Sequence, residues 1–504
     1  MILLLSITLP IILLLYILYK TKHQAKTTLI VNRKPPLPLI GNLHQLAGAA
    51  DPHIYLHQVS RKYGPIIHMK LGSTPLLVIS SSKLAKQVLK IQDSSFCSRP
   101  KLLVQQKLSY NSSDLVFTPY NERWREMKKV THIHLLNPKK VQSFRPLREE
   151  EISRMITKIR SSCSDNRAVN LSEATMAAAS RLASAICFGK RYEEGGSETR
   201  RYGRIVRGFD ALMTTFFVSD YFPALSWVDK ISGKMRDADR MCKDMDSFYQ
   251  ELIDERLDSR ARAEVEEEEK EKDMLSVLIK LIEDKSSSTH LTWDNIKALL
   301  MDMISASSET IPASTIWTMT ALIKAPKVMK KLQNEIRSLV GEKGKVDEDD
   351  LPKLPYLKAV INETFRMYPP GPLLVPRESM ETSILDGYEI APKTRVYVNA
   401  YAVGRDPEYW KNPDEFIPER FFNSNIDFKG QDFGLIPFGS GRRMCPGMNI
   451  GHLSMELMVA NLLYCFDWEL PKGIHVEDVD TNPTHGPVVH KKNALLLVPK
   501  IYGF

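Results

Sequence analysis

The stretch Pro437-Phe438-Gly439-Ser440-Gly441-Arg442-Arg443-Met444-Cys445-Pro446-Gly447 sets one cysteine in a run of glycines, and an apolar-periodic segment follows it. Glycine accepts backbone angles that a Cβ forbids, so the loop can fold tightly and point its amide N–H groups inward. The periodicity after the loop predicts a helix, whose dipole favours a thiolate over a thiol at its N-terminus. Cys445 is therefore a candidate soft metal ligand. The alternative is a buried structural cysteine in a glycine-rich turn.

The pattern Phe438-x-x-Gly441-x-Arg443-x-Cys445-x-Gly447 resembles the haem-binding loop of the cytochromes P-450, the haem-thiolate monooxygenases. The resemblance implies that Cys445 is the axial iron ligand of haem b and that Arg443 pairs with a haem propionate. A thiolate ligand donates electron density to haem iron and favours cleavage of the O–O bond.

Length and composition are compatible with one large enzyme domain. The chain has 504 residues, of which 43% are hydrophobic and 26% charged, as in ordinary globular proteins. A net charge of +9 is mild for this length and favours an anionic membrane surface or an acidic partner. No long basic run is interleaved with aromatic residues, so we do not expect a nucleic-acid partner. The six cysteines are scattered and form no CxxC pair, which indicates a reducing compartment.

Residues 1–19 carry no charge and are long enough for a transmembrane helix, which needs about 20 residues. A signal peptide would have a basic start and a small-residue cleavage site, so we predict a retained single-pass anchor. Lysines follow it directly, which predicts a cytosolic catalytic domain. Residues 20–42 are basic and proline-rich and predict a stiff hinge, as in microsomal members of the family, and residues 43–504 form the catalytic domain. The expected location is the endoplasmic reticulum membrane.

A long apolar helix is predicted from a cap at Thr292 to about Lys324, passing through the core. It contains Glu309-Thr310, and the local explanation of the hydroxyl is a bond back to a carbonyl one turn earlier. Pro312 cannot donate to the carbonyl of Ser308, so we expect the helix to open there.

The family has an acid–threonine pair in its central helix. The resemblance implies proton delivery by Glu309 and hydrogen bonding to dioxygen by Thr310. Ser307 stands where the family usually has glycine, and Ile311 where it often has Thr or Ser. These departures motivate one alternative, a haem-thiolate dehydratase or isomerase that consumes no dioxygen. A second alternative is an inactive membrane-anchored binding protein.

Trp124 and Lys128 lie four residues apart on a predicted helix and share a face. From these residues alone a solvated face with one anchoring tryptophan is the simpler interpretation. The resemblance implies instead that both bind a haem propionate, with Lys128 where the family usually has arginine. It also implies that Arg377 holds the second propionate.

Glu363 and Arg366 lie three residues apart on a predicted helix, and Arg420 follows downstream in Pro418-Glu419-Arg420-Phe421. Such pairs are common on surfaces and contribute little there. The resemblance implies a buried ion cluster of the three residues that supports the cysteine loop.

Taken together, the resemblance covers the chain after residue 30 and is greatest to the plant A-type microsomal members. It implies a mainly α-helical single domain with small β-sheets. Within residues 63–80, two β-rich runs separated by Gly72-Ser73-Thr74 independently predict a hairpin. The implied reaction is NADPH-driven insertion of one oxygen atom into an apolar small molecule, in specialised metabolism. No flavin or nicotinamide motif is present, so electrons would come from a separate NADPH–cytochrome reductase. Lys128, Lys129 and Arg442 are candidate docking residues for that partner. The pocket is expected from residues 101–118, 209–217, 301–305, 373–375 and 487–489.

Overall fold

The computed structural model describes residues 36–163, 167–192, 196–262, 273–284, 290–422 and 424–503. The predicted anchor, residues 1–19, and most of the predicted hinge lie outside these ranges. Within the described ranges, no helix is both long enough and apolar enough to cross a membrane.

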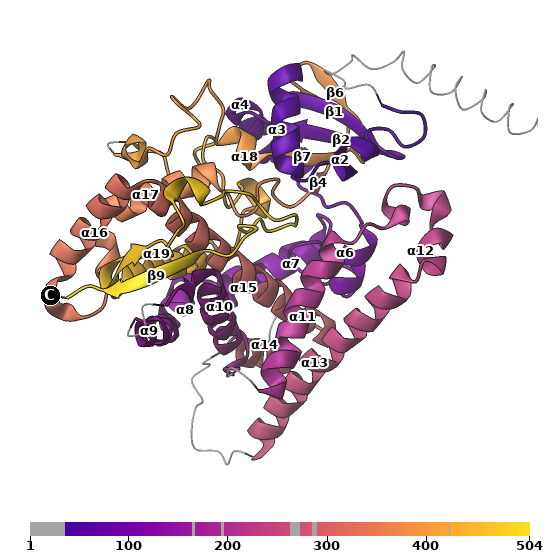
Figure 1. The fold of residues 1–504 in the computed structure, drawn as a ribbon. Coiled ribbons are helices and arrows are strands. Elements are labelled where there is room, and N and C mark those ends of the chain that lie inside the picture. Colours follow the sequence, from indigo (N-terminus) through magenta and orange to yellow (C-terminus); the bar gives the residue numbers. More distant parts are fainter. Residues whose placement is uncertain are drawn as a thin grey trace, which may run out of the picture.

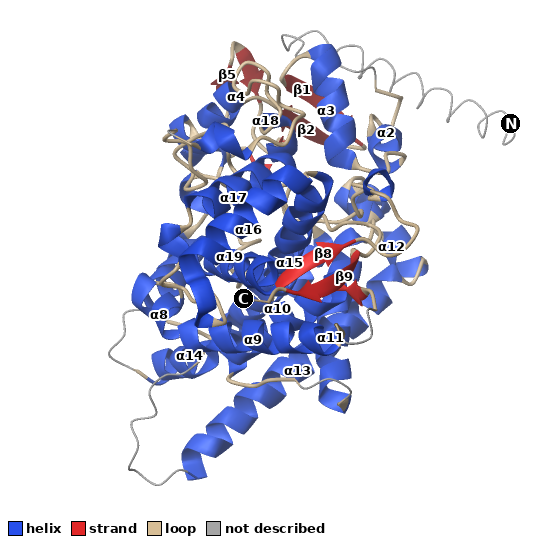
Figure 2. Ribbon diagram, turned by 60° about the vertical axis from the view of Figure 1, so that its left-hand side comes forward, coloured by secondary structure: helices blue, strands red, loops and turns tan. Residues whose placement is uncertain are grey.

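Helices make up most of the molecule, as predicted (Figure 2). The α-helices are α2 Leu43–Ala47, α3 Pro52–Tyr63, α4 Ser82–Lys86, α5 Asp93–Phe96, α6 Leu103–Leu108, α7 Glu122–Val130, α8 Pro138–Ser143, α9 Arg145–Ser161, α10 Leu171–Phe188, α11 Ser197–Thr214, α12 Trp227–Ile231, α13 Lys234–Arg262, α14 Met274–Glu283, α15 Trp293–Lys324, α16 Pro326–Val340, α17 Pro355–Met367, α18 Ala400–Val403 and α19 Met448–Cys465.

In the described part of the chain, three small sheets accompany the helices, and the largest lies at one end of the molecule (Figure 1). Their strand orders are β1-β2-β7-β4, β3-β9-β8 and β5-β6. The bounds are β1 Ile66–Leu71, β2 Thr74–Ile79, β3 Val169–Asn170, β4 Arg377–Glu378, β5 Ser383–Leu385, β6 Tyr388–Ile390, β7 Arg395–Val398, β8 Phe466–Glu469 and β9 Leu496–Ile501. The predicted hairpin is confirmed, because β1 and β2 pair antiparallel with Ile66 opposite Ile79.

The end of the proline-rich segment is attached to this sheet. Leu37 bridges to Gly41, and Gly41 bridges to Leu71 of β1. The Asn42 side-chain oxygen accepts from the Lys70 amide at 2.9 Å, and the Lys70 carbonyl accepts from the Asn42 amide at 2.5 Å. Residues 37–42 are therefore part of the folded body.

Helix α15 runs through the core, and its predicted extent is confirmed. Thr292 caps its first turn and exchanges hydrogen bonds with Asn295 in a capping box. Residues such as Leu299 pack in one apolar cluster with α10, α11, α13 and α14, whereas residues such as Met319 pack in another with α9, α10, α16, α17 and α19. The segment 305–310 lies between the two clusters. Glu309 and Thr310 thus lie between the two apolar clusters, although other polar residues of the helix, such as Asp302 and Thr318, are buried elsewhere along it.

Candidate active site

The cysteine loop is a tight turn that places Cys445 three residues before the first helical residue of α19, Met448. The Cys445 amide donates to the Phe438 carbonyl at 2.9 Å, which closes the loop. Gly439 and Gly441 have φ of 68° and 74°, the left-handed region that favours glycine. A Cβ on Gly441 would lie 2.1 Å from the Leu89 carbonyl oxygen, so only glycine fits this approach.

Cys445 is a free thiol, and its ionisation differs from the prediction. Burial raises the pKa of the thiol to about 11, although the Gly447 N–H opposes the shift. The prediction that the dipole of α19 favours the thiolate is therefore wrong for the protein alone, because the cost of desolvating the anion exceeds the help from the turn. A bound metal cation would reverse this balance.

Three arginines converge on the cysteine loop. Arg443 donates to the Thr118 carbonyl at 2.6 Å, and Arg377 donates to the Ser440 carbonyl at 3.0 Å. The sequence analysis missed the third, Arg99, which donates to the Val375 carbonyl at 2.7 Å. It stands in Ser98-Arg99-Pro100, where nothing local distinguishes it from a surface arginine.

Burial and mutual repulsion destabilise the charges of these arginines. Burial lowers the pKa of Arg443 to about 9, and the charge of Arg377 adds to the effect. The pKa of Arg99 is likewise lowered by burial and by the charges of Arg443 and Arg377. Asp93 pairs with Arg377 at 2.9 Å and with Arg442 at 3.0 Å. In the described chain, no carboxylate forms an ion pair with Arg99 or Arg443.

Helix α7 places Trp124 and Lys128 beside the cysteine loop. The Trp124 indole N–H donates to the Leu115 carbonyl at 3.1 Å, and its ring lies 4.2 Å from the Arg443 guanidinium. Lys128 lies over the same ring at 5.3 Å and donates to the Arg442 carbonyl at 2.9 Å. The burial of Trp124 agrees with the simpler interpretation, a solvated face with one anchoring tryptophan, whereas the hydrogen bond from Lys128 to the cysteine loop goes beyond it.

This donor set fits haem. Cys445 offers a sulfur ligand of the kind that haem iron accepts. Arg99 and Arg443 have no carboxylate partner in the described chain, and Arg377 shares Asp93 with Arg442. The two propionates of haem are carboxylates that match these guanidinium groups. Trp124 and Lys128 add an indole and an ammonium group to the same cluster.

The predicted ion cluster Glu363–Arg366–Arg420 is present and buried. Arg366 pairs with Glu363 at 2.7 Å, and Arg420 pairs with the same carboxylate at 3.0 Å. The cluster is linked to the cysteine loop, since Phe365 packs edge-on against Phe438 at 5.3 Å. The contact of Glu363 with Arg420, which the resemblance to the family implied, is confirmed.

On α15 the hydroxyls are bonded to the helix itself. Thr310 donates to the Ala306 carbonyl at 2.7 Å, and Ser307 donates to the Met303 carbonyl at 2.6 Å. The predicted opening at Pro312 is not seen, because α15 is continuous from Trp293 to Lys324. The loss of one backbone N–H is tolerated without interrupting the helix, because apolar packing holds the turns on both sides of Pro312.

Glu309 has partners that the sequence did not predict. Its Oε2 lies 2.6 Å from Nε2 of His490, in the turn before β9. Burial, followed by the charge of Glu309, raises the pKa of the Asp210 carboxyl on α11 to about 7. Within the described ranges, no three His, Cys, Asp or Glu side chains are grouped to hold a metal ion.

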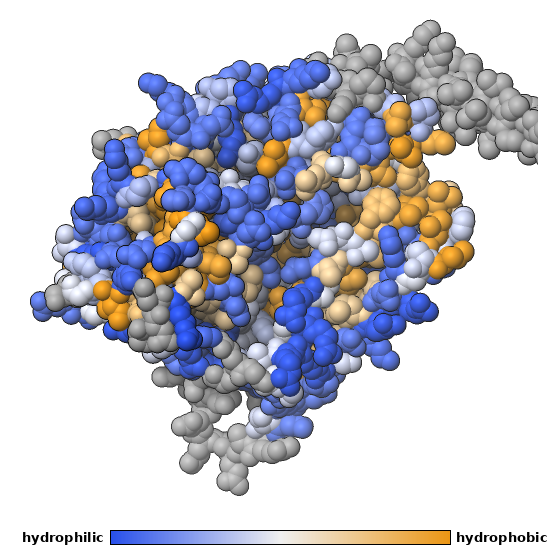
Figure 3. Space-filling view, viewed as in Figure 1, coloured by the Kyte–Doolittle hydropathy of each residue, from blue (hydrophilic) through white to orange (hydrophobic). Residues whose placement is uncertain are grey.

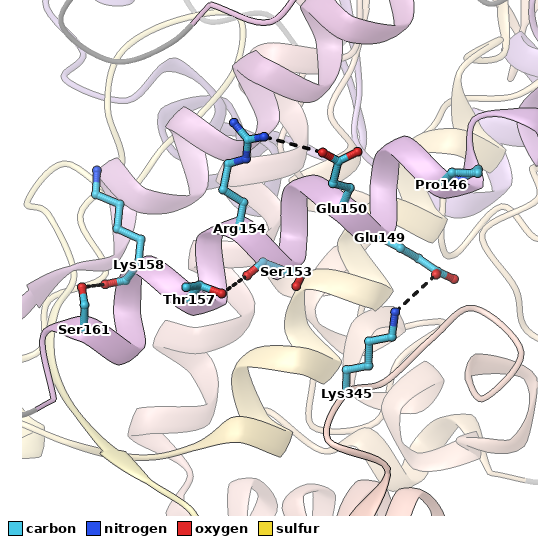
Figure 4. A pocket seen from close by; sticks show the side chains of 9 residues that line it. All are labelled: Pro146, Glu149, Glu150, Ser153, Arg154, Thr157, Lys158, Ser161 and Lys345. Carbon is cyan, nitrogen blue, oxygen red and sulfur yellow. Dashed lines mark hydrogen bonds and ion pairs between the residues drawn. The ribbon is translucent and has the colours of Figure 1, made fainter.

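A surface groove along α9 is separate from this site (Figure 4). Most of its lining residues are polar or charged, and two pairs of them interact: Arg154 with Glu150 at 3.5 Å and Lys345 with Glu149 at 3.8 Å. None of the candidate site residues lines the groove.

Comparison with known proteins supports the interpretation of this site as a haem-thiolate site. Residues 32–498 match the family model for cytochrome P450. The chain is 46% identical to 6,7,8-trihydroxycoumarin synthase of Pastinaca sativa, over 97% of this chain and 96% of that one. It is 44% identical to xanthotoxol synthase of the same plant, over 92% of each chain. It is also 44% identical to cytochrome P450 71A1 of Persea americana, over 91% of each.

A solved structure, a zebra fish cytochrome P450 with progesterone, has the same fold. Its TM-score is 0.75 at 22% identity, covering 90% of this chain and 100% of that one. The family model and the plant relatives cover nearly the whole chain. The chain therefore belongs to the cytochrome P450 family, among its plant A-type members, and is a haem-thiolate monooxygenase.

Proposed function

We propose that this protein is a membrane-anchored monooxygenase that hydroxylates an aromatic small molecule of the coumarin class. The observation that carries the proposal is the convergence of Cys445, Trp124 and the arginines Arg99, Arg377 and Arg443 on one loop, beside a helix with an acid–threonine pair. The names of two relatives, a trihydroxycoumarin synthase and a xanthotoxol synthase, support this substrate class.

The residues around the cysteine loop fall into groups with different roles in this proposal. When bound, haem supplies reductive activation of dioxygen and insertion of one oxygen atom into the substrate. Cys445 ligates the iron. Arg99, Arg377 and Arg443 neutralise the propionates, and Trp124 and Lys128 donate hydrogen bonds to them.

On α15, Glu309 and Thr310 handle protons and hydrogen bonds. The Thr310 hydroxyl donates to Ala306 in this structure, so it must rotate away from that carbonyl before it can donate to dioxygen. Rotation of a hydroxyl is fast and leaves the helix intact. Thr310→Ala should raise the amount of peroxide released per NADPH oxidised, whereas Thr310→Ser should retain most of the coupling.

We propose that the membrane-facing surface combines residues 1–42 with the region around α12. Ile40 and Tyr221 both hydrogen-bond to the turn of the β1–β2 hairpin, at 3.1 and 2.8 Å. Apolar side chains are exposed over α12 in Figure 3, with Ile231 78% and Trp227 56% exposed. An exposed apolar patch beside the attached end of the hinge is typical of a membrane contact. The endoplasmic reticulum location follows from the anchor and the cytosolic side of its lysines.

Electrons would reach haem from a separate NADPH–cytochrome reductase. Lys129 and Arg442 are exposed, and Lys128 is half-buried beside the cysteine loop. Charge reversal at Lys129 should weaken the salt dependence of turnover, because such docking is electrostatic. An unchanged salt dependence would contradict this docking site.

The deciding experiment is a carbon monoxide difference spectrum of the reduced membrane-bound protein, followed by assays with hydroxylated coumarins. The thiolate-ligated band should appear for the wild type and vanish for Cys445→Ala. Products should contain one oxygen atom from dioxygen and should require both NADPH and the reductase. The absence of the band in the wild type would refute the assignment of Cys445.

The dehydratase or isomerase alternative rests on Ser307 and Ile311, the two departures from the family pattern. The hydroxyls of Ser307 and Thr310 both donate hydrogen bonds to backbone carbonyls of α15, and this observation favours the alternative. Product formation in the absence of oxygen and NADPH would decide for this alternative.

A further inference from the structure

Trp317 of α15 joins two segments that are far apart in the sequence. Its indole N–H donates to the Val489 carbonyl at 2.8 Å, and its ring stacks on the Tyr368 ring at 4.8 Å, with 1° between the planes. The Val489 amide in turn donates to the Pro370 carbonyl at 2.8 Å. Trp317 is 2% exposed and Val489 5%, so these bonds are shielded from water and strengthened by it. One buried indole therefore holds two distant segments to α15 and to each other.

The first segment, residues 368–377, leads from the indole to the cysteine loop. A Cβ on Gly439 of that loop would lie 3.7 Å from Cδ1 of Leu374, which places this leucine against the loop. Leu374 has a φ of 52°, a value that leucine rarely adopts and that its surroundings must hold in place. Beyond it, Arg99 donates to the Val375 carbonyl at 2.7 Å. The first segment thus runs from Trp317 to the arginine cluster.

The second segment is the turn of residues 484–490, which lies beside the acid–threonine pair. The His490 amide donates to the Thr484 hydroxyl at 2.9 Å, and the Thr484 amide donates to the His490 carbonyl at 2.7 Å, so the turn is closed. Oε2 of Glu309 lies 2.6 Å from Nε2 of His490. The two segments therefore border the site from different directions, one at the cysteine loop and the other at Glu309.

We propose that Trp317 is a positioning residue that determines specificity, because it sets where residues 373–375 and 487–489 stand beside the substrate. The inference rests on the proposed function, in which the substrate lies between the cysteine loop and the pair Glu309–Thr310. Both sets of residues are apolar, so they suit an apolar ring rather than a charged group. A wall that is already ordered loses no conformational entropy when such a ring binds.

The anchoring by Trp317 is measured by hydrogen exchange of the haem-loaded protein, which does not depend on turnover. Trp317→Phe keeps a ring that can stack on Tyr368 but removes the N–H donor to Val489. The Val489 amide should then exchange about tenfold faster, the fold-change for one buried hydrogen bond. Trp468→Phe is the matched control, because Trp468 is also buried and donates to the Leu462 carbonyl at 3.0 Å. The control should leave the exchange of Val489 unchanged.

The effect on ligand choice is measured with two probes that ligate haem iron, imidazole and phenylimidazole. They differ only in the phenyl ring, which has to fit between the two segments. In Trp317→Phe the affinity for phenylimidazole relative to imidazole should fall about tenfold, because the loosened segments must be ordered when the ring binds. Trp468→Phe should keep the wild-type ratio. An unchanged or raised ratio in Trp317→Phe would overturn the inference.

A second variant tests the same anchoring if Trp317→Phe fails to fold. Tyr368→Leu removes the stacked ring and leaves the indole N–H in place. The Leu374 amide, which donates to the Gly371 carbonyl at 3.0 Å, should exchange about fivefold faster, as expected for one aromatic pair. The affinity ratio of the two probes should fall by a similar factor. Wild-type exchange and a wild-type ratio in Tyr368→Leu would contradict the proposed anchoring.

The outcomes separate this inference from the proposed function. A wild type without the thiolate-ligated carbon monoxide band would refute the proposed function, and with it the role of Trp317 in specificity. A normal band with unchanged exchange at Val489 would refute the anchoring alone. Faster exchange with an unchanged affinity ratio would make Trp317 a purely structural residue and overturn its role in specificity. The thermal unfolding midpoint of each variant verifies that it folds.

Discussion

Replacing Glu363 by alanine tests whether the buried ion cluster supports the cysteine loop. The Glu363 carboxylate accepts from Arg366 at 2.7 and 2.8 Å, from Arg420 at 3.0 Å and from the Ile417 amide at 2.7 Å. Glu363 and Arg366 side chains are both 0% exposed. Removing the carboxylate leaves a buried guanidinium without its counter-charge, which costs about 3–5 kcal/mol.

Part of this cost is offset. Arg366 also donates to the carbonyls of Gly404 and Pro413, each at 2.6 Å, and these bonds survive the substitution. We therefore expect a loss of about 3 kcal/mol, the lower end of the range for a broken buried pair. The loss should be accompanied by faster release of haem, because Phe365 joins the cluster to the loop through Phe438.

The assay is urea unfolding of the full-length holoenzyme at fixed haem occupancy, followed by far-ultraviolet circular dichroism and haem absorbance. Asp237→Ala is the matched control, because Asp237 and Arg240 are also three residues apart but are 68% and 69% exposed. An exposed pair of this kind contributes less than about 1 kcal/mol. The reasoning would be refuted if Glu363→Ala and Asp237→Ala lost the same free energy of unfolding.

Other residues give predictions of the same kind. Burial raises the pKa of Asp302 well above its usual range, and the charge of Asp114 adds to the shift. The folded chain therefore keeps a proton that the unfolded chain releases above about pH 4. Wild-type stability to urea should fall as pH rises through this window, and Asp302→Asn should flatten the profile. Gly441→Ala should abolish haem binding, whereas Gly451→Ala, with nothing within 4 Å of its added Cβ, should retain it. Lys128→Met should weaken haem affinity about tenfold in a transfer assay, equivalent to about 1.5 kcal/mol for one charged hydrogen bond.

Features encoded locally in the sequence were predicted well. The hairpin of β1 and β2, the helix from its cap at Thr292 and the pair Glu363–Arg366 depend on residues close together in the chain. The approach of Arg420 followed from the resemblance to the family and is confirmed.

Features that depend on distant segments could not be predicted in this way. Arg99, Asp210 and His490 acquire their surroundings only when the helices and turns pack, and no local spacing distinguishes them. The thiol of Cys445 shows the same limit, because its pKa depends on how completely the folded loop excludes water. The continuity of α15 at Pro312 likewise depends on apolar packing from both sides.

The arginine cluster makes assembly of the holoenzyme conditional on cofactor supply. Arg99, Arg377 and Arg443 repel one another in a buried region, so the chain without haem carries a stored electrostatic penalty. A ligand that binds only the folded state adds its binding free energy to stability, and here it also removes this repulsion. Newly synthesised chains that find no haem would therefore unfold more readily and be degraded. The abundance of the protein in the cell should then follow the haem supply, even at a constant rate of synthesis.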